Sequence, residues 1–345
     1  MNLTRAQALD LFSSPDLVGI GMEADALRRK LHPEGVVTYI IDRNINYTNF
    51  CTEYCSFCAF YRPLGHKEGY ILDQEVIFQK IQETLDLGGT GILMQGGLHP
   101  DLKIEWFEDL FRSIKQRFPQ IWLHCLSAPE VTCIAEVSGL NLRNTIARLR
   151  DSGLDSIPGG GAEILDDGVR HRISRLKCNT SEWIDVHKTA HQLGMRTTAT
   201  MMFGCGETIE QRMNHLDIVR NIQEETGGFT AFIPWTFQRE NTSLGRFVKE
   251  EATAVEYLKT LAISRLYLDN ILNVQSSWVT QGLKTCQVGL RFGGNDVGSI
   301  MIEENVVSQA GAHHRSSEEE LRRIIRDAGF IPKQRDTLYT TYFLN

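Results

Sequence analysis

The chain has 345 residues, of which 42% are hydrophobic and 23% are charged, and its formal net charge is −7. This composition is typical of a folded globular protein and excludes long disordered tracts. The acidic balance argues against a nucleic-acid or anionic-membrane partner, because such partners require concentrated basic surface. Charged residues interrupt the N-terminal segment and no apolar run is long enough to span a bilayer, so we expect a cytoplasmic protein.

Apolar, β-branched runs alternate with amphipathic stretches along most of the chain. The expected strands are 36–41, 91–95, 121–126, 156–158, 196–203, 230–234, 273–276 and 287–291. Between them, apolar residues recur at helical spacing over 73–87, 104–118, 181–193, 209–225 and 252–270. Capping boxes at Thr208/Gln211 and Ser317/Glu320 mark two helix starts. The alternation predicts an α/β fold, a (β/α)8 TIM-type barrel with right-handed crossovers.

The segments outside the predicted strands extend the barrel rather than form further domains. We expect one barrel domain over residues 1–345, with an N-terminal helical cap over 1–35, a core over 36–300 and a C-terminal extension over 301–345 that contains a short helix. The sequence contains no internal repeat. It also contains no Pro/Gly/Ser-rich linker long enough to separate two domains.

Three closely spaced cysteines follow the first predicted strand. Cys51, Cys55 and Cys58 form a C-x3-C-x2-C pattern, which can ligate three irons of a [4Fe-4S] cluster and leave the fourth open to a small molecule. Two alternatives remain. The thiols could be buried small hydrophobes, or they could bind zinc together with His66. The other five cysteines form no second pair of this kind and are expected to be inert.

The loops after the other strands are candidate ligand sites, because the carboxyl ends of barrel strands build the active site in this architecture. Gly96 and Gly97 follow the second strand and allow a ligand to approach the backbone, although a plain turn would use glycines equally well. Glu163 follows the fourth strand and could accept hydrogen bonds from ribose hydroxyls. It could equally stabilise the N-terminus of the following helix.

The cysteine pattern, with Phe57 immediately before the last cysteine, resembles the radical S-adenosylmethionine (SAM) superfamily. The resemblance implies a [4Fe-4S] cluster whose fourth iron is chelated by SAM, and reductive cleavage of SAM to a 5′-deoxyadenosyl radical. It also implies that Gly96–Gly97 contacts the SAM amine, that Glu163 binds the ribose, and that the segment around Phe203 cradles adenine. Cys205 stands where relatives often carry histidine and has no assigned role. A flavodoxin or ferredoxin is the expected electron donor.

Three further segments narrow the resemblance. Residues 40–49, 232–238 and 293–305 resemble the menaquinone/deazaflavin branch of that superfamily, and among its families most closely the cyclic dehypoxanthine futalosine synthases. That resemblance implies a small-molecule substrate, dehypoxanthine futalosine, contacted by Trp235 and Asn295. The alternation around Trp235 could instead pack the core. Sibling enzymes acting on a chorismate-derived enol ether or on tyrosine remain possible, as does a non-catalytic metal-binding protein.

The reaction that the resemblance implies has three steps. A ribose hydrogen is removed by the SAM-derived radical, the carbon radical adds to the benzoate ring, and loss of one electron and one proton restores aromaticity. A benzoate carboxylate would suit a guanidinium group, for which Arg62 and Arg291 are the candidates. Asp296 is the candidate proton acceptor, and Glu303 is the alternative.

Overall fold

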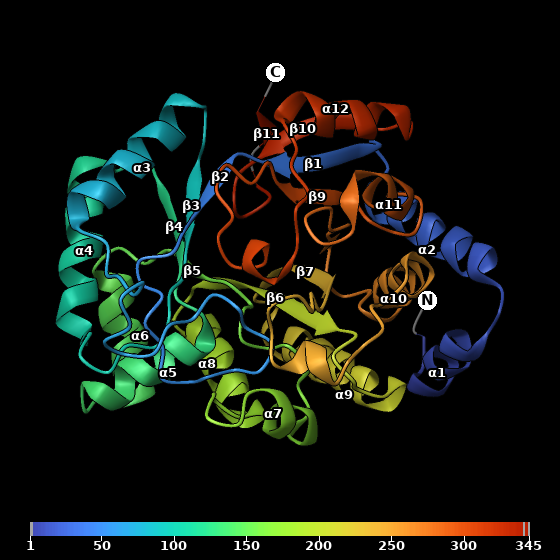
Figure 1. The fold of residues 1–345 in the computed structure, drawn as a ribbon. Helices are drawn as coiled ribbons and strands as arrows, with labels where there is room; N and C mark the ends of the chain where they lie inside the picture. The colour runs from blue at the N-terminus through green and yellow to red at the C-terminus, as the bar shows by residue number, and fades with distance from the viewer. Residues whose placement is uncertain (1–2, 341, 344–345) are drawn as a thin grey trace.

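Parallel strands curl around a central axis and helices cover their outer side (Figure 1). The computed structural model describes residues 3–340 and 342–343. Residues 1–2 of the predicted N-terminal cap, and residues 341, 344 and 345 of the predicted C-terminal extension, lie outside the described residues. None of the helices within the described ranges is long and apolar enough to cross a membrane.

One sheet of seven parallel strands, in the order β2-β3-β4-β5-β6-β7-β8, makes up most of the barrel. The second sheet has the order β11-β10-β1-β9. The strands are β1 (Val36–Ile40), β2 (Asp42–Ile45), β3 (Gly91–Met94), β4 (Trp122–Cys125), β5 (Ser156–Ile157), β6 (Arg196–Phe203), β7 (Phe229–Thr236), β8 (Asn273–Val274), β9 (Asp296–Ser299), β10 (Ile331–Arg335) and β11 (Tyr342–Phe343).

The two sheets join into one ring. β1 and β2 are consecutive segments separated only by Ile41, so the strand that pairs with β9 continues into the strand that pairs with β3. On the other side, a parallel bridge between Gln275 and Asp296 connects the end of β8 to β9. Eight parallel positions therefore surround the axis, and the predicted (β/α)8 fold is confirmed.

Helices follow the strands in the expected alternation. They are α1 (Arg5–Ser13), α2 (Leu17–Leu31), α3 (Gln74–Asp86), α4 (Ile104–Arg117), α5 (Ala128–Val137), α6 (Leu142–Asp151), α7 (Asp167–Ile173), α8 (Thr180–Gln192), α9 (Ile209–Thr226), α10 (Ala254–Tyr267), α11 (Gly282–Gly289) and α12 (Glu318–Asp327), with short 3-10 turns η1 (Leu244–Arg246) and η2 (Ser308–Ala310). The capping boxes predicted at Thr208 and Ser317 are both present, and they fix the starts of α9 and α12.

The predicted eighth strand at 287–291 is wrong. Residues 287–289 end α11, where Val288 is exposed, and the eighth strand is β9, several residues further on. The C-terminal extension also differs from the expected helical cap, because β10 pairs in parallel with β1 on the side opposite β9. The chain end therefore carries side chains to the barrel wall.

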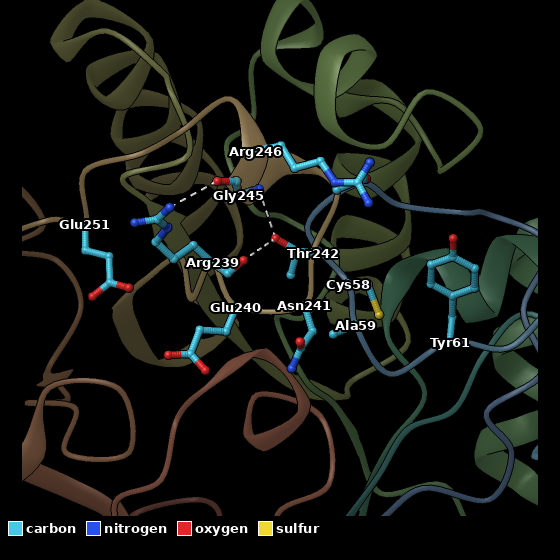
Figure 2. A pocket seen from close by; sticks show the side chains of 11 residues that line it. Cys58, Ala59, Tyr61, Arg239, Glu240, Asn241, Thr242, Gly245, Arg246 and Glu251 are labelled. Carbon is cyan, nitrogen blue, oxygen red and sulfur yellow. Dashed lines mark hydrogen bonds between the residues drawn. The ribbon is translucent and has the colours of Figure 1, made fainter.

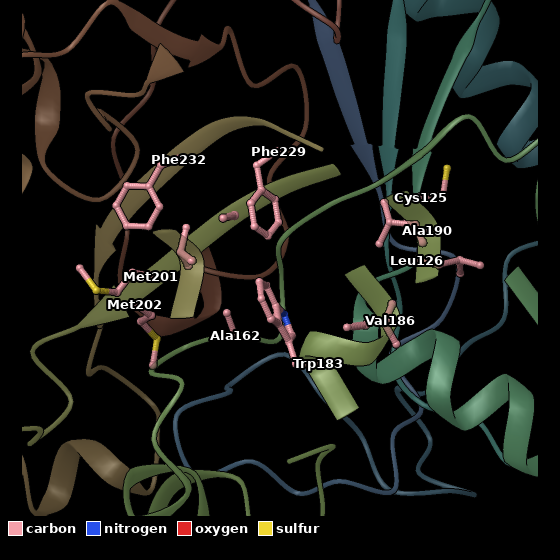
Figure 3. Packing of buried hydrophobic residues seen from close by; sticks show 14 of the residues in the cluster. Cys125, Leu126, Ala162, Trp183, Val186, Ala190, Met201, Met202, Phe229 and Phe232 are labelled. Atoms are coloured by element: carbon pink, nitrogen blue, oxygen red, sulfur yellow. The ribbon is translucent and has the colours of Figure 1, made fainter. Parts of the chain in front are cut away.

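Buried apolar residues fill the space between the strands and the outer helices. Figure 3 shows part of this core, where Trp183 of α8 lies beside Phe229 of β7. Their rings stack with centroids 6.1 Å apart. His187 and His215, which the sequence places on helices, are fully buried in this layer, as expected for packing residues. The core holds the strand ends in fixed positions, which is the requirement for a preorganised site.

Candidate active site

The three-cysteine loop lies directly after β2 and is held by backbone hydrogen bonds. Cys51 N–H donates to Arg62 O at 3.0 Å within the loop, and Thr52 N–H donates to Leu98 O at 3.1 Å in the segment after β3. Cys51 and Cys55 are buried and Cys58 is half-buried. Burial raises the pKa of all three thiols above its usual range.

All three cysteines line one cavity of about 450 Å³. The cavity continues along the barrel interior to side chains of the strands, among them Asp42, His124 and Arg335. We call the part lined by the three cysteines the cysteine end, and the part lined by Asp42, His124 and Arg335 the strand end. Among the described residues, no group of three or more His, Cys, Asp or Glu side chains is gathered closely enough to hold one metal ion, whereas in an iron–sulfur cluster each cysteine ligates a separate iron.

Gly96 and Gly97 border the cysteine end, and neither position accepts a side chain. A Cβ on Gly97 would lie 2.1 Å from the carbonyl oxygen of Phe50 and 2.8 Å from Cβ of Cys51. A Cβ on Gly96 would lie 2.7 Å from the ring of Tyr47. The glycines therefore allow the loop after β3 to pack against the cysteine loop and keep bare backbone at the cavity wall.

Glu130 connects these loops, a role that sequence reasoning did not assign. Its buried carboxylate accepts hydrogen bonds from Tyr47 Oη at 2.8 Å, Gly96 N–H at 2.9 Å and Ser127 N–H at 2.7 Å. Burial raises its pKa, and these donors oppose that shift. The capping-box pattern at Ser127–Glu130 was the available signal, but it did not reveal that the same carboxylate holds two other loops.

Glu163 and Lys177 form a buried ion pair beside the cysteines. Glu163 has a positive φ of 41°, and its Oε1 accepts from Lys177 Nζ at 2.9 Å. Burial alone would lower the pKa of Lys177, but Glu163 and Cys55 outweigh it and raise that pKa. The ammonium group also lies 5.4 Å from the ring centroid of Phe57. Within the described part of the chain, the buried Glu163 Oε2 has no hydrogen-bond partner. A free, buried acceptor at the cavity wall fits a ligand hydroxyl.

Two of the predicted ligand contacts, Trp235 and Phe203, differ in exposure to the cavity. Trp235 lies in β7 and lines the cavity. Phe203 is fully buried and stacks on Tyr257 with centroids 6.3 Å apart, while the guanidinium group of Arg212 lies 4.5 Å from its ring centroid. The neighbouring Met202 N–H donates to the carbonyl of Glu163. Phe203 thus packs behind the wall.

The predicted proton acceptors both lie in ion pairs. Asp296 is fully buried and receives two hydrogen bonds from the Arg335 guanidinium group, at 2.7 and 3.0 Å, and one from Thr38 Oγ1 at 2.6 Å. Glu303 accepts from Arg43 Nε at 2.7 Å and from Lys80 Nζ at 2.6 Å. Neither residue is among those that line the cavity.

The remaining predicted substrate contacts are also engaged elsewhere. Arg62 donates to the carbonyls of residues 59–61 and to Glu68, so it supports the cysteine loop. Arg291 donates to the carbonyl of Ala328 outside the barrel. Asn295 is buried and accepts from Arg265 Nη2 at 2.6 Å. The structure does not bring these three side chains to the cavity.

The strand end contains three ionisable groups that sequence reasoning did not single out. Asp42 lines the cavity, and burial raises its pKa to about 6. His124 also lines it, and burial lowers the pKa of its imidazole to about 3, so this ring is neutral at pH 7. Arg335 reaches the cavity from β10. No local motif marks them, because they come from strands far apart in the chain.

Protein-family models cover nearly the whole chain. The radical SAM superfamily model matches residues 45–219, and the CofH/MqnC C-terminal region model matches residues 226–344. The first includes the cysteine loop and the second includes β9 and β10.

Curated relatives of two kinds are similar over nearly full length. A protein of Halalkalibacterium halodurans named cyclic dehypoxanthine futalosine synthase is 52% identical, over 98% of this chain and 90% of its own length. One of the same name from Streptomyces coelicolor is 46% identical, over 98% and 85%. A 5-amino-6-(D-ribitylamino)uracil–L-tyrosine 4-hydroxyphenyl transferase of Methanothermobacter thermautotrophicus is 42% identical, over 98% and 94%.

Two solved structures share the fold at low sequence identity. The crystal structure of methylornithine synthase has a TM-score of 0.69 and 19% identity, with 96% of this chain and 94% of that chain covered. A maturase of the [FeFe]-hydrogenase has a TM-score of 0.75 and 13% identity, with 96% and 72% covered. At this sequence identity, the two similarities show a shared fold and no shared activity.

Proposed function

The chain belongs to the radical SAM superfamily and to its CofH/MqnC branch, and from this membership we propose that it cyclises dehypoxanthine futalosine. The observation that carries the proposal is the continuous cavity, with three cysteines at one end and Asp42, His124 and Arg335 at the other. Its volume of about 450 Å³ lies within the usual range for small-molecule sites. The two relatives named cyclic dehypoxanthine futalosine synthase support the choice of substrate.

The cofactors of the enzyme are a [4Fe-4S] cluster and SAM. When bound, they supply a 5′-deoxyadenosyl radical that removes one hydrogen atom from the substrate. We assign cluster ligation to Cys51, Cys55 and Cys58. We assign SAM binding to four residues around them, which are Phe57, Gly96, Gly97 and Glu163. The unpartnered Oε2 of Glu163 supports its role toward a ribose hydroxyl.

At the strand end, polar groups suit the oxygen-rich substrate. Asn44 lines the cavity, and among the described residues its Oδ1 has no hydrogen-bond partner. Trp235 offers an apolar surface against which an aromatic ring can pack. Arg335 also lines this end, where its guanidinium group is paired with Asp296. Together these groups would hold the ribose and the ring in contact and exclude water.

Asp42 is the carboxylate best placed to accept the proton lost on rearomatisation. It lines the cavity, and its pKa of about 6 is close to the value that a general base needs near neutral pH. Asp296 and Glu303 also remain proposals for this role, but their oxygens are occupied by cationic partners. In the proposed conversion one hydrogen atom of the substrate goes to 5′-deoxyadenosine, one proton goes to the carboxylate, and one electron would return to the oxidised cluster, as the new carbon–carbon bond forms. The product is therefore two hydrogens lighter than the substrate.

The test is an anaerobic reaction of the reconstituted enzyme with dithionite, SAM and dehypoxanthine futalosine. We expect 5′-deoxyadenosine together with a product two hydrogens lighter by mass spectrometry. Formation of 5′-deoxyadenosine without that product would reject the substrate. Absence of 5′-deoxyadenosine from an enzyme that carries its full complement of iron and sulfide would reject the assigned site.

A second candidate reaction has its own support. The relative named 5-amino-6-(D-ribitylamino)uracil–L-tyrosine 4-hydroxyphenyl transferase is similar over 98% of this chain. Incubating the same enzyme with 5-amino-6-(D-ribitylamino)uracil and tyrosine distinguishes the two reactions, because each predicts a different product mass.

A further inference from the structure

Polar side chains are used differently in the interior cavity and in a surface cavity of about 760 Å³ beside the cysteine loop. In the surface cavity, Arg239 Nη2 donates to Gly245 O at 3.4 Å (Figure 2). Thr242 Oγ1 donates to Arg239 O at 2.8 Å and accepts from Gly245 N–H at 3.0 Å. These groups therefore hold their own turn together. The interior cavity differs, because a donor on His124 remains free there.

His124 lies on β4, is half-buried and lines the interior cavity. Side chains alternate between the two faces of a strand, so His124 shares its face with Trp122. Leu123 and Cys125, on the other face, are fully buried in the apolar core. On the neighbouring strand β5, Ser156 lies directly opposite His124. The polar face of β4 thus meets a hydroxyl group inside the barrel.

A chain of hydrogen bonds connects these polar side chains. Trp122 Nε1–H donates to Ser156 Oγ at 2.8 Å, and Ser156 Oγ lies 2.7 Å from Nδ1 of His124. An indole nitrogen can only donate. Ser156 is buried, and within the described residues its hydroxyl contacts no acceptor other than His124 Nδ1. The Ser156 hydroxyl therefore donates to Nδ1.

This bond assigns the tautomer of the His124 ring. Because Nδ1 accepts, the neutral imidazole carries its proton on Nε2. Burial and the charge of Arg335 lower the pKa of His124 to about 3, so the ring is neutral at pH 7. Nε2–H is accordingly a hydrogen-bond donor in the resting enzyme.

The Nε2–H group of His124 is both unpartnered and accessible. Within the described part of the chain, no hydrogen bond to Nε2 of His124 is formed. The Nε2 atoms of His187 and His215 also lack a partner, but they are buried. Nε2 of His124 is not buried in this way, and the space beside it is the interior cavity. A ligand in the cavity can therefore reach it.

Several other donors along the cavity are already engaged. Asn46 Nδ2 and Thr200 Oγ1 donate to backbone carbonyl oxygens, at 3.0 and 2.7 Å. Lys177 and Arg335, the cationic side chains among the described residues that line the cavity, are each paired with a carboxylate. A ligand anion at the strand end therefore meets no unpaired cation there, whereas His124 offers it a neutral N–H group.

We propose that His124 Nε2–H donates a hydrogen bond to the benzoate carboxylate of the substrate, and that Ser156 positions this donor by fixing the tautomer. A carboxylate that leaves water for the cavity requires donors, and a hydrogen bond to an ionised oxygen is stronger than one to a neutral oxygen. The contact breaks no bond and transfers no proton. It would hold the aromatic ring in one orientation relative to the ribose. The inference rests on the proposed function, because it assigns a partner to the carboxylate of that substrate.

Calorimetry tests the contact in the enzyme that carries its cluster and SAM, without reductant, so that no turnover occurs. His124→Phe removes the donor and should weaken binding of dehypoxanthine futalosine about tenfold or more. His124→Gln places an amide N–H near the position of Nε2 and should recover part of the loss. His171→Phe, the same substitution at an exposed position of α7, is the matched control and should leave the dissociation constant unchanged.

A substrate analogue without the carboxylate identifies which substrate group His124 contacts. The unsubstituted enzyme should bind the analogue about tenfold more weakly than the substrate, whereas His124→Phe should bind the two with nearly equal affinity. Equal losses in both proteins would overturn the carboxylate contact. A parallel loss of SAM affinity in His124→Phe would show a structural defect and would also overturn it.

The positioning role of Ser156 is tested by NMR of the enzyme with nitrogen-labelled histidine, and His124→Gln identifies the His124 signals by their loss. The proton should be on Nε2 in the unsubstituted enzyme. Ser156→Ala should give a mixture of both tautomers, and Trp122→Phe, which keeps the bond between Ser156 and His124, should not. A proton on Nδ1 in the unsubstituted enzyme would overturn the assignment.

These measurements separate the inference from the proposed function. Normal substrate binding in His124→Phe, together with cyclisation by the unsubstituted enzyme, would reject the role of His124 alone. Failure of the unsubstituted enzyme to bind dehypoxanthine futalosine would reject that substrate and with it the carboxylate contact. The tautomer measurement needs no substrate and would still confirm or reject the free Nε2–H donor.

Discussion

The two ends of the interior cavity are built in different ways. At the cysteine end, short chain segments such as 51–58 and 95–97 meet through backbone hydrogen bonds and bare glycines. At the strand end, Asp42, His124 and Arg335 come from three strands spread along almost the whole chain, and an ion pair with Asp296 holds Arg335. One end is local and the other is assembled by the fold.

The two ends would therefore have different roles. The cysteine end would generate the radical, and the strand end would determine which bond the substrate radical forms. The cysteine end is built from the loops that follow β2, β3, β4 and β5, and each loop contributes a short segment of the chain. The assembled end depends on the complete barrel, including β10 from the chain terminus. We therefore expect substitutions at the cysteine end to lower the formation of 5′-deoxyadenosine, and substitutions at the strand end to change the formation of the cyclised product.

Cys55→Ala gives the largest expected effect. Loss of one ligand should remove the cluster, because only three cysteines are available in this loop. Iron content, the visible absorbance of the cluster and 5′-deoxyadenosine formation should all fall to background. Cys133→Ala is the matched control, since this half-buried thiol on α5 interacts electrostatically with Cys51 but is not an assigned ligand. A cluster retained in Cys55→Ala would contradict the assigned ligands.

Asp42→Asn should lower formation of the cyclised product without stopping formation of 5′-deoxyadenosine. The cyclised product should fall about a hundredfold or more, the contribution typical of a general base, while 5′-deoxyadenosine still forms. Because burial raises the pKa of Asp42 to about 6 and the acceptor must be ionised, product formation in the unsubstituted enzyme should rise with pH through that value. The variant should lose this dependence. If Asp296→Asn or Glu303→Gln removed it instead, with Asp42→Asn unaffected, the acceptor would be reassigned to that residue.

Arg335→Met should destabilise the assembled end. Arg335 and Asp296 are 7% and 0% exposed, and removing one partner leaves the other charge buried. Such losses cost about 3–5 kcal/mol of unfolding free energy. Urea denaturation measures the change. Arg326→Met, which breaks an exposed pair on α12, should cost about 0.5 kcal/mol or less. Adding Asp296→Asn to Arg335→Met should recover part of the loss, and no recovery would contradict this explanation.

The same contrast explains what the sequence could predict. The three cysteines, Gly96–Gly97 and Glu163 were predicted from short patterns at the ends of recognisable strands, and all of these residues line the cavity. Asp42 carried no such pattern. It lies at the start of a polar strand, and its pKa depends on burial by the rest of the barrel.

The error at the eighth strand has the same origin. Residues 287–291 alternate apolar and polar side chains over too short a run to distinguish a strand from a helix end. β9, in contrast, begins with Asp296, a residue that is unfavourable in strands. Its burial is stabilised by Arg335 from β10, a partner 39 positions away that local pattern cannot reveal.

Glu163→Gln should give the smallest effect and test whether the cysteine end binds SAM through this residue. Glutamine keeps the side-chain shape but removes the charge that faces Lys177 and weakens the free acceptor in the cavity. Hydrogen bonds to charged groups contribute about 1.5–3 kcal/mol, so SAM affinity should fall about tenfold or more. Equilibrium binding of SAM measures this, with cluster absorbance unchanged. Glu240→Gln, in the surface cavity, is the matched control and should leave SAM affinity unaltered. Unchanged SAM affinity in Glu163→Gln would contradict SAM binding by this carboxylate and would leave its ion pair with Lys177 as its role.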